Sequence, residues 1–482
     1  MHTGKPDDST LIERTKAPSS AHFESNDSLS LVLTWSHDEP ERVGEVVVVP
    51  SGRSTLGRAV EPRHNGWHSL VLSQTRPQGQ VETGPLRSAH ISRYQLTFDA
   101  TPKGTSVELT GRGCLRVNGQ EVTLAQLSPG DRVQVAGKFS LLVSTRPRLW
   151  LKEHVTKRPF AYGLADPHGL VGESPAAWLL RRECEYLGQH DDHILVCGPS
   201  GVGKELAVRA IHAHSPKQGK ELVARNAATI PESLIDAELF GNLRDYPNPG
   251  SPDRPGLLGM AHGTTLFLDE IGELPQQMQA HLLRVMDSGE YQRLGDARRS
   301  YTSARIIAAT NRNLECLKHD FVARFIHRVE VPGLAQRLED IPLIARHLAR
   351  EIAKRDPEVR RKFFNGDEPR FSEALINMLL TIPYRTNVRE LARVLWQAVR
   401  QGEGPRIQAP SILALHTKAV PSLPEAVDRT TGLSRARVLD VLNAVGWVRE
   451  QAWRELGLAN RYQLRRLLAR LSIDPSSDTP TS

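Results

Sequence analysis

The stretch ILVCGPSGVGKELAVRAI, residues 194–211, decides the fold of this chain. Its four leading apolar residues predict a buried strand, and the apolar residues that recur three and four apart after Glu205 predict an amphipathic helix. The glycine-rich turn between them presents backbone N–H groups at a helix N-terminus, which is a binding site for phosphate. A purely structural glycine turn is the alternative, which the order of strand, turn and helix disfavours. The predicted cofactor-binding loop consists of Gly198, Pro199, Ser200, Gly201, Val202, Gly203, Lys204 and Glu205, and Glu205 takes the place of the Ser or Thr that holds magnesium in the general motif.

A second apolar strand, residues 266–268, ends in the acids Asp269 and Glu270. Asp269 suits the carboxylate that holds Mg²⁺, and Glu270 suits the general base that polarises a water molecule. Standing alone, the two acids would be interpreted as a solvated turn or a helix cap. Together with Lys204, whose ammonium group pairs with β- and γ-phosphate oxygens, they predict a site that hydrolyses ATP with magnesium.

The pattern of apolar residues divides the 482-residue chain into several domains. Short alternating runs with turn dipeptides predict an N-terminal β-sandwich. Strands that alternate with helices predict a central α/β domain with a parallel sheet, followed by a helical lid and a C-terminal all-α domain. The predicted segments are a disordered tail over residues 1–28, the sandwich over 29–145, a linker over 146–167, the α/β core over 168–335, the lid over 336–403, a second linker over 404–424, the all-α domain over 425–473 and a tail over 474–482.

Composition restricts the classes of function. The net charge of +7 is consistent with a polyanionic partner, although a basic excess spread over the surface only aids solubility. No segment approaches the roughly 18 apolar residues of a membrane span, and the first 26 residues lack the apolar core of a secretory signal. We therefore expect a cytoplasmic protein without a membrane partner. The four cysteines lie far apart, which argues against a zinc ribbon or a disulfide framework.

From Leu170 to Leu391 the chain resembles the AAA+ domain of sigma-54-dependent enhancer-binding transcription regulators. The resemblance depends on the phosphate loop with Glu205 after its lysine, on the stretch ELFG at residues 238–241, on DEIGELP at 269–275 and on AATN at 308–311. It implies a homo-oligomeric ring, a hexamer or heptamer, that binds ATP and Mg²⁺ at its subunit interfaces.

The resemblance also assigns roles to single residues. It implies that Asn226 restrains Glu270, that Asn311 is the sensor I residue and that Arg389 is the sensor II arginine that contacts the nucleotide. Each has a plainer interpretation when taken singly: Asn311 as a strand cap and Arg389 as a surface arginine. Their joint order along the chain favours the functional roles.

Arg324 and Lys318 fall at the two arginine-finger positions, which reach the γ-phosphate bound by the neighbouring subunit. Lys318 departs from the family, because a lysine lacks the forked guanidinium group. We therefore expect slow hydrolysis.

The loop that contacts sigma-54 in this family reads Gly-Ala-Phe-Thr-Gly-Ala, whereas residues 245–250 here read DYPNPG. Two prolines fix the backbone angle φ, so a loop that must move with nucleotide state becomes stiffer. We predict that the contact with RNA polymerase carrying sigma-54 is weakened or lost. Tyr246 is a candidate replacement for the missing aromatic contact.

The N-terminal sandwich resembles a forkhead-associated (FHA) domain in residues 57–58, 90–93 and 117–119. This implies a phosphothreonine protein as partner, with the phosphate held by Arg58 and Ser92 beside Arg93. Gln95 and Gly113 replace a histidine and an asparagine of the FHA pattern. Two interpretations therefore stay open, a phosphopeptide reader and a sandwich that only contacts proteins.

Three apolar-periodic segments close the chain, at residues 438–445, 449–456 and 460–471, with a glycine turn after the second. They predict a helix-turn-helix and resemble the Fis-type module of these regulators. A solvated arginine face is the alternative to double-stranded DNA binding. The residues expected to contact DNA are Arg461, Arg465, Arg466 and Arg470.

Together these features predict a transcription regulator that binds DNA and controls RNA polymerase by ATP turnover in a ring. A DNA-binding scaffold that uses nucleotide only to control its assembly is the second interpretation, favoured by Lys318 and the replaced loop. A DNA-processing or chaperone ATPase is disfavoured, because the similarities combine features of transcription regulators.

Overall fold

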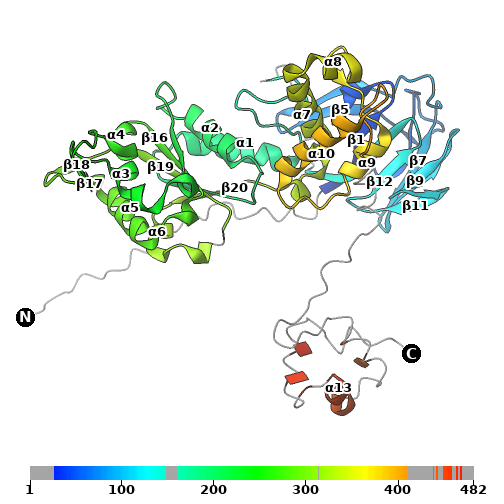
Figure 1. The fold of residues 1–482 in the computed structure, drawn as a ribbon. Coiled ribbons are helices and arrows are strands. Elements are labelled where there is room, and N and C mark those ends of the chain that lie inside the picture. The colour runs from blue at the N-terminus through cyan, green and yellow to red at the C-terminus, as the bar shows by residue number, and fades with distance from the viewer. Residues whose placement is uncertain are drawn as a thin grey trace, which may run out of the picture. The chain divides into compact units, whose positions relative to one another are not determined.

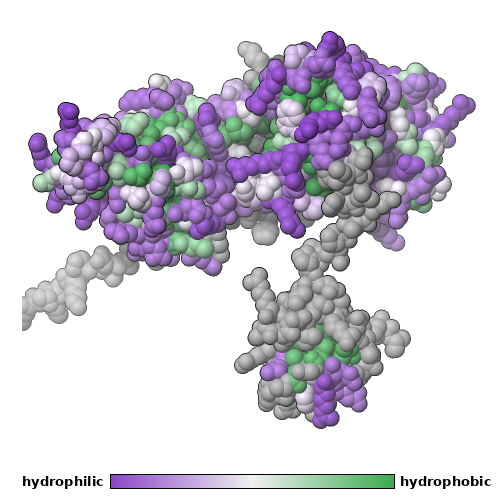
Figure 2. Space-filling model, viewed as in Figure 1, coloured by the Kyte–Doolittle hydropathy of each residue, from purple (hydrophilic) through white to green (hydrophobic). Residues whose placement is uncertain are grey.

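The computed structural model describes three continuous parts of the chain and several short pieces near its end (Figure 1). The described residues are 27–147, 160–312, 314–410, 438, 441–442, 449–456, 458, 463–464 and 467–468. They divide into two compact units, residues 1–410 and residues 411–482. On the visible face of the first unit hydrophilic residues predominate, with apolar residues scattered between them (Figure 2). Such a surface is expected when most large apolar side chains are in the core.

Two β-sheets form the N-terminal region, as predicted. The first has the strand order β10 (Gln120–Val122), β9 (Leu115–Val117), β12 (Arg132–Val135), β13 (Phe139–Pro147), β1 (Asp27–Ser36), β2 (Val46–Val48), β5 (Leu72–Arg76) and β6 (Gly79–Gly84). The second has the order β11 (Leu124–Leu127), β8 (Gly104–Leu109), β7 (Leu96–Thr101), β3 (Gly52–Leu56) and β4 (His68–Leu70). Alternate residues of both sheets, such as Leu31 and Leu33 on β1 and Phe98 on β7, belong to one buried cluster. This is the period-two burial of a sandwich.

The central sheet is parallel throughout and has the order β15 (Val223–Asn226), β16 (Thr265–Asp269), β19 (Arg305–Thr310), β14 (Ile194–Cys197) and β20 (His327–Glu330). Ile194 and Val196 of β14 join one buried cluster and Leu195 joins another, so the strand is covered on both faces. The helices of this domain, drawn mainly in green in Figure 1, are α1 (Pro175–Gly188), α2 (Lys204–Ala213), α3 (Ile235–Phe240), α4 (Gly256–Met260), α5 (Gln276–Ser288) and α6 (His319–Ala323). A hairpin of β17 (Glu290–Gln292) and β18 (Arg299–Tyr301) follows α5.

The predicted helical lid follows the sheet. It comprises α7 (Ile341–Arg355), α8 (Pro357–Phe363), α9 (Glu373–Leu379) and α10 (Asn387–Gln401), with the short strands β21 (Phe364–Asn365) and β22 (Glu368–Pro369). Ser372 accepts a hydrogen bond from the Leu375 N–H and so caps α9. The expectation of helices alone therefore missed only the small β21–β22 pair.

Two parts of the predicted linker 146–167 are described: residues 146–147, which end β13, and residues 160–167, which make hydrogen bonds to other segments. The Tyr162 hydroxyl donates to the Gly44 carbonyl at 2.7 Å, and the Gly163 N–H donates to Glu173 Oε1 at 2.8 Å. Phe160 and Tyr162 also place their rings against the Arg76 guanidinium, so this part of the predicted linker packs against the domains that it joins.

The second unit contains one helix of which several consecutive residues are described, α13 (Arg449–Glu455). Its apolar residues and those of the flanking segments form one buried cluster: Val438, Leu442, Ala452, Leu456, Leu458, Leu464, Leu467 and Leu468. All three segments in which apolar periodicity was predicted contribute to this cluster, and Leu458 joins it from the predicted turn between the second and third segments. The proposed DNA contacts Arg461, Arg465, Arg466 and Arg470 lie outside the described residues. No described helix has the length and apolar character needed to cross a membrane.

Candidate nucleotide-binding site

The phosphate loop requires glycine at several positions. Gly198, Gly201 and Gly203 have φ angles of 152°, 76° and 101°, a region that other residues rarely adopt. A Cβ atom on Gly201 would lie 2.2 Å from the carbonyl oxygen of Thr386 in the lid. The loop therefore adopts the tight conformation that the sequence predicted, with Gly203 at the N-terminus of α2.

A cavity of about 800 Å³ opens beside this loop. Its volume is within the range of small-molecule and cofactor sites. One part of its lining is charged: Lys204, Glu205, Arg209, Asp269, Glu270, Arg337 and Arg389. Another part is apolar and suits a nucleotide base: Leu170, Val171, Ile344, Leu348, Val388 and Ala392. His168 and His347 also line the cavity, and burial lowers the pKa of both imidazoles, which favours their neutral forms.

Lys204 and Glu270 converge at the charged part of the cavity. The Lys204 ammonium donates to the Gly198 carbonyl at 3.1 Å and lies 3.9 Å from Glu270 Oε1. Asp269 ends β16, and its Oδ1 accepts the Glu270 N–H at 3.0 Å. Glu270 itself has φ 53° and ψ 47°, the left-handed conformation, which turns the chain sharply at the strand end.

The lid contacts the phosphate loop through the first turn of α10. The predicted sensor II residue Arg389 donates from Nη1 to Ser200 Oγ at 3.1 Å. Asn387, which sequence analysis did not single out, donates from Nδ2 to the Ser200 carbonyl at 3.1 Å and accepts the Leu334 N–H at 2.9 Å. Its φ of 45° is a left-handed conformation that asparagine tolerates better than most residues. The asparagine residue type was therefore the only sequence signal for this position.

Arg337 is a second residue that sequence analysis missed. It lines the cavity, is 6% exposed and donates from Nη2 to the Val202 carbonyl of the phosphate loop at 3.1 Å. Its Nε has no hydrogen-bond partner within the part of the chain that is described. A buried guanidinium with a spare donor suits an anionic ligand.

The two predicted asparagines lie at strand ends. Asn226 pairs in register with Asp269, but its side chain accepts the Ala228 N–H at 2.9 Å and so caps the turn η3 (Ala227–Thr229). Asn311 directly follows β19 and is exposed.

The two finger positions lie elsewhere. Arg324 is about half exposed and pairs through Nε with Asp287 Oδ1 at 2.9 Å. Lys318 is also exposed, at the N-terminus of α6. The described lining of the cavity includes neither residue. Neither residue therefore contributes to this cavity within the described part of the chain.

The parallel sheet of this strand order, the phosphate loop and the helical lid define an AAA+ nucleotide-binding domain. Residues 170–334 match the family described as the sigma-54 interaction domain, and residues 335–426 match the AAA+ ATPase lid domain.

The chain is also similar to whole proteins. The chain is 31% identical over 515 residues to the Nif-specific regulatory protein of Bradyrhizobium diazoefficiens, with 91% of this chain and 85% of that protein covered. It is 34% identical over 312 residues to the transcriptional regulatory protein ZraR of Escherichia coli K12, with 63% and 69% covered. A crystal structure of NtrX from Brucella abortus in complex with ATP is similar with a TM-score of 0.46 and 29% identity, covering 63% of this chain and 68% of that one.

The chain belongs to the family of sigma-54-dependent enhancer-binding transcription regulators. The resemblance on which the sequence interpretation depended is thereby confirmed, and the second interpretation, a scaffold, is disfavoured.

Proposed function

We propose that this regulator hydrolyses ATP in a homo-oligomeric ring and uses the cycle to control RNA polymerase at DNA to which it is bound. The observation that carries the proposal is the convergence of Lys204, Asp269 and Glu270 on one cavity while Arg324 lies outside it. A site with its cation and carboxylates in one chain and its finger on another is complete only in an assembly.

Four charged residues of the cavity have separate tasks in this proposal. Lys204 exchanges its carbonyl partner for the β- and γ-phosphate oxygens, because a charge-assisted bond is the stronger one. Glu270 accepts a proton from the attacking water. Arg389 and Arg337 orient the phosphates from the lid side.

Magnesium fits the donor set. Within the described residues no group of three or more His, Cys, Asp or Glu side chains is placed to hold a metal ion. Mg²⁺ does not need such a cage, since it retains waters and is bound by one or two carboxylates together with substrate phosphates. Asp269 is the carboxylate that would hold it, and the ion would neutralise charge on the phosphates.

The test is steady-state ATP hydrolysis by the full chain and two variants. Glu270→Gln is expected to bind nucleotide and lose turnover, and Arg324→Ala is expected to do the same. A parent protein without turnover would refute the motor and favour the scaffold. Arg324→Ala protein that regains turnover when mixed with Glu270→Gln protein would support a shared site, because each variant then supplies what the other lacks.

RNA polymerase with sigma-54 is the partner that family membership supports. The replaced loop is closed on itself: the Gly250 N–H donates to Asp245 Oδ1 at 2.7 Å, and the Asn242 amide donates to three carbonyls between residues 243 and 252. Tyr246 is 43% exposed and packs on Gly295. This supports the prediction of a weakened contact. Robust ATP-dependent open-complex formation with sigma-54 holoenzyme would refute it.

We also propose that the sandwich binds a phosphothreonine protein. Arg58 and Arg93 are exposed, and the Arg58 N–H donates to the Ser92 carbonyl at 3.2 Å, so the three residues lie together. Gln95, in place of the FHA histidine, accepts the Ser92 N–H at 3.0 Å and keeps that loop in place. A phosphothreonine peptide that binds no better than its unphosphorylated form would leave only the protein-contact role.

For the C-terminal arginines we propose DNA phosphate and base contacts. Their replacement by alanine, singly, should weaken DNA binding and lower its salt dependence. Unchanged binding would identify them as a solvated face.

A further inference from the structure

Two arginines of the sandwich are buried against acids of the AAA+ domain. Arg76 ends β5 and Arg146 lies on β13, and they are 3% and 1% exposed. Arg76 binds Glu173 with two parallel bonds, Nη2 to Oε1 at 2.6 Å and Nε to Oε2 at 2.9 Å. Arg146 Nη1 donates to Glu339 Oε2 at 2.8 Å.

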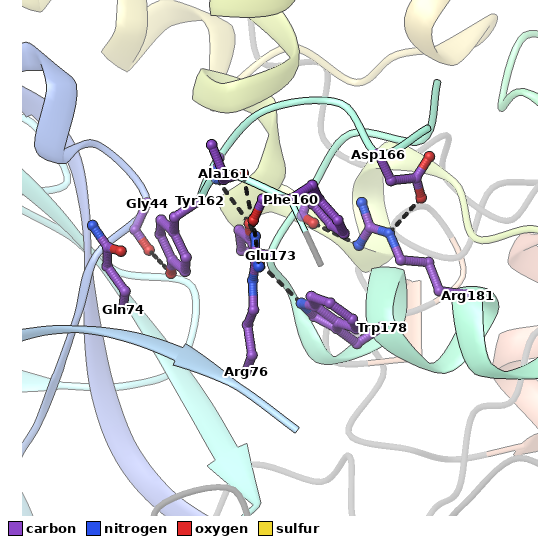
Figure 3. Close-up of polar contacts among 12 residues, drawn as sticks. Gly44, Gln74, Arg76, Phe160, Ala161, Tyr162, Asp166, Glu173, Trp178 and Arg181 are labelled. Carbon is purple, nitrogen blue, oxygen red and sulfur yellow. Dashed lines mark hydrogen bonds and ion pairs between the residues drawn. The ribbon is translucent and has the colours of Figure 1, made fainter. Parts of the chain in front are cut away.

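The first pair is enclosed by aromatic rings (Figure 3). The Arg76 guanidinium lies 4.3 Å from the ring centre of Phe160 and 5.1 Å from that of Trp178. The Trp178 indole N–H donates to Glu173 Oε2 at 3.0 Å, and Arg76 Nη1 donates to the Phe160 carbonyl at 2.9 Å. Both charges are thus desolvated and fully hydrogen-bonded, the condition under which a buried ion pair fixes one geometry.

The two acids belong to the segments that build one wall of the nucleotide cavity. Glu173 follows Leu170 and Val171, which line its apolar part, and Glu339 lies two residues after Arg337. Asp340 joins these segments, because its Oδ1 accepts the N–H groups of Glu173 and Ser174 at 2.8 and 2.9 Å.

We propose that Arg76 and Arg146 are positioning residues for nucleotide binding. They hold Glu173 and Glu339, and through them the segments 170–174 and 337–340, in the geometry that the base and phosphates require. The sandwich is thereby a part of the nucleotide site, and its displacement weakens the affinity of that site. This inference rests on the proposed nucleotide-binding function.

The test measures binding of mant-ADP, a fluorescent ADP analogue, to the full chain. Arg76→Met and Arg146→Met are each expected to weaken binding at least about fivefold. This is the lower end of the usual range over which one site changes the affinity of another. Arg53→Met is the matched control, because Arg53 pairs with Asp99 at 3.2 Å on the exposed surface of the same sandwich, and its affinity should equal that of the parent.

Further variants separate positioning from stability. Arg146→Met combined with Glu339→Gln leaves no unpaired buried charge, so its melting temperature should recover while the affinity stays low. Arg76→Lys should not restore affinity, since lysine cannot make the two parallel bonds. In ATP hydrolysis the methionine variants should raise KM and leave kcat within about twofold, as expected when ground-state and transition-state binding are lost equally.

A measurement on the unmodified chain decides the matter if the variants do not fold. By reciprocity, ADP should slow hydrogen exchange in the peptides of β5 and β13, and leave those of β8 and β11 on the other sheet unchanged. Equal exchange in β5 and β13 with and without ADP, or parental affinity in both methionine variants, would overturn this inference and leave the proposed function intact. Failure of the parent to bind mant-ADP would refute the proposed function and, with it, this inference.

Discussion

The backbone conformation of Glu270 predicts that two substitutions at this residue abolish catalysis equally but differ in their effect on stability. Its left-handed conformation, φ 53° and ψ 47°, costs a residue with a Cβ atom about 1–2 kcal/mol. Glu270→Gln keeps that cost, whereas Glu270→Gly removes it and adds about 0.5–1 kcal/mol of glycine chain entropy. Both variants lose the carboxylate that lies 3.9 Å from Lys204 Nζ, so that loss cancels between them.

The net expectation is that Glu270→Gly is more stable than Glu270→Gln by up to about 1.5 kcal/mol. In a domain of this size the difference corresponds to up to about 6 °C in Tm. Neither variant should hydrolyse ATP, and both should bind mant-ADP. The assay is differential scanning calorimetry of the two variants under identical conditions, next to an ATPase measurement.

Glu273 supplies the control, because it ends the turn η5 (Ile271–Glu273) without a positive φ angle. There the order should reverse, with Glu273→Gly less stable than Glu273→Gln. A Glu270→Gly protein that melts below Glu270→Gln would show that the conformation is not strained, and residual ATPase activity in either variant would remove Glu270 from the role of base.

Three further predictions concern the surroundings of the site. Burial, and then the neighbouring Glu339, raises the pKa of Asp340 to about 6 from its ordinary 3.8, so its contribution to stability is present below pH 3.8 and is lost as the pH rises through 6. The Tm of Asp340→Asn minus that of the parent should therefore increase between pH 4 and pH 7, and a constant difference would contradict the shift. Gly201→Ala should weaken mant-ADP binding at least about tenfold and lower the Tm by several degrees, because its Cβ would lie 2.2 Å from a carbonyl oxygen of the lid. Parental affinity would show that the lid moves away from the new Cβ without cost. Asp287→Asn frees Arg324 from a half-exposed pair and should lower the protein concentration for half-maximal hydrolysis by up to about fivefold, and an unchanged concentration would contradict competition between Asp287 and the ring.

Local features could be predicted from the sequence, and distant pairings could not. The loop at residues 198–204 follows from its own glycines, and the β-strands of the sandwich follow from alternation. The contact of Arg337 with Val202 joins residues 135 positions apart, and no pattern of spacing in the sequence predicts it. The burial of Arg76 could not be predicted either, because arginine residues are mostly exposed in proteins and its partner Glu173 lies 97 positions away.

The partners of the site's cations indicate which step controls hydrolysis. Lys204 and Arg389 make hydrogen bonds to neutral oxygens, the Gly198 carbonyl and the Ser200 hydroxyl, and Lys204 Nζ also lies 3.9 Å from Glu270 Oε1. Phosphate replaces such partners at a gain, because charge-assisted bonds are about twice as strong as neutral ones. Arg324 differs, since in the proposed ring its 2.9 Å contact with Asp287 must break before it reaches the neighbouring nucleotide. In this proposal nucleotide binding is favoured within one chain, whereas the catalytic site is completed only in the assembly. The sandwich, joined to the wall of the cavity by two buried ion pairs, is proposed to act on nucleotide binding, and the ring is proposed to complete the catalytic site.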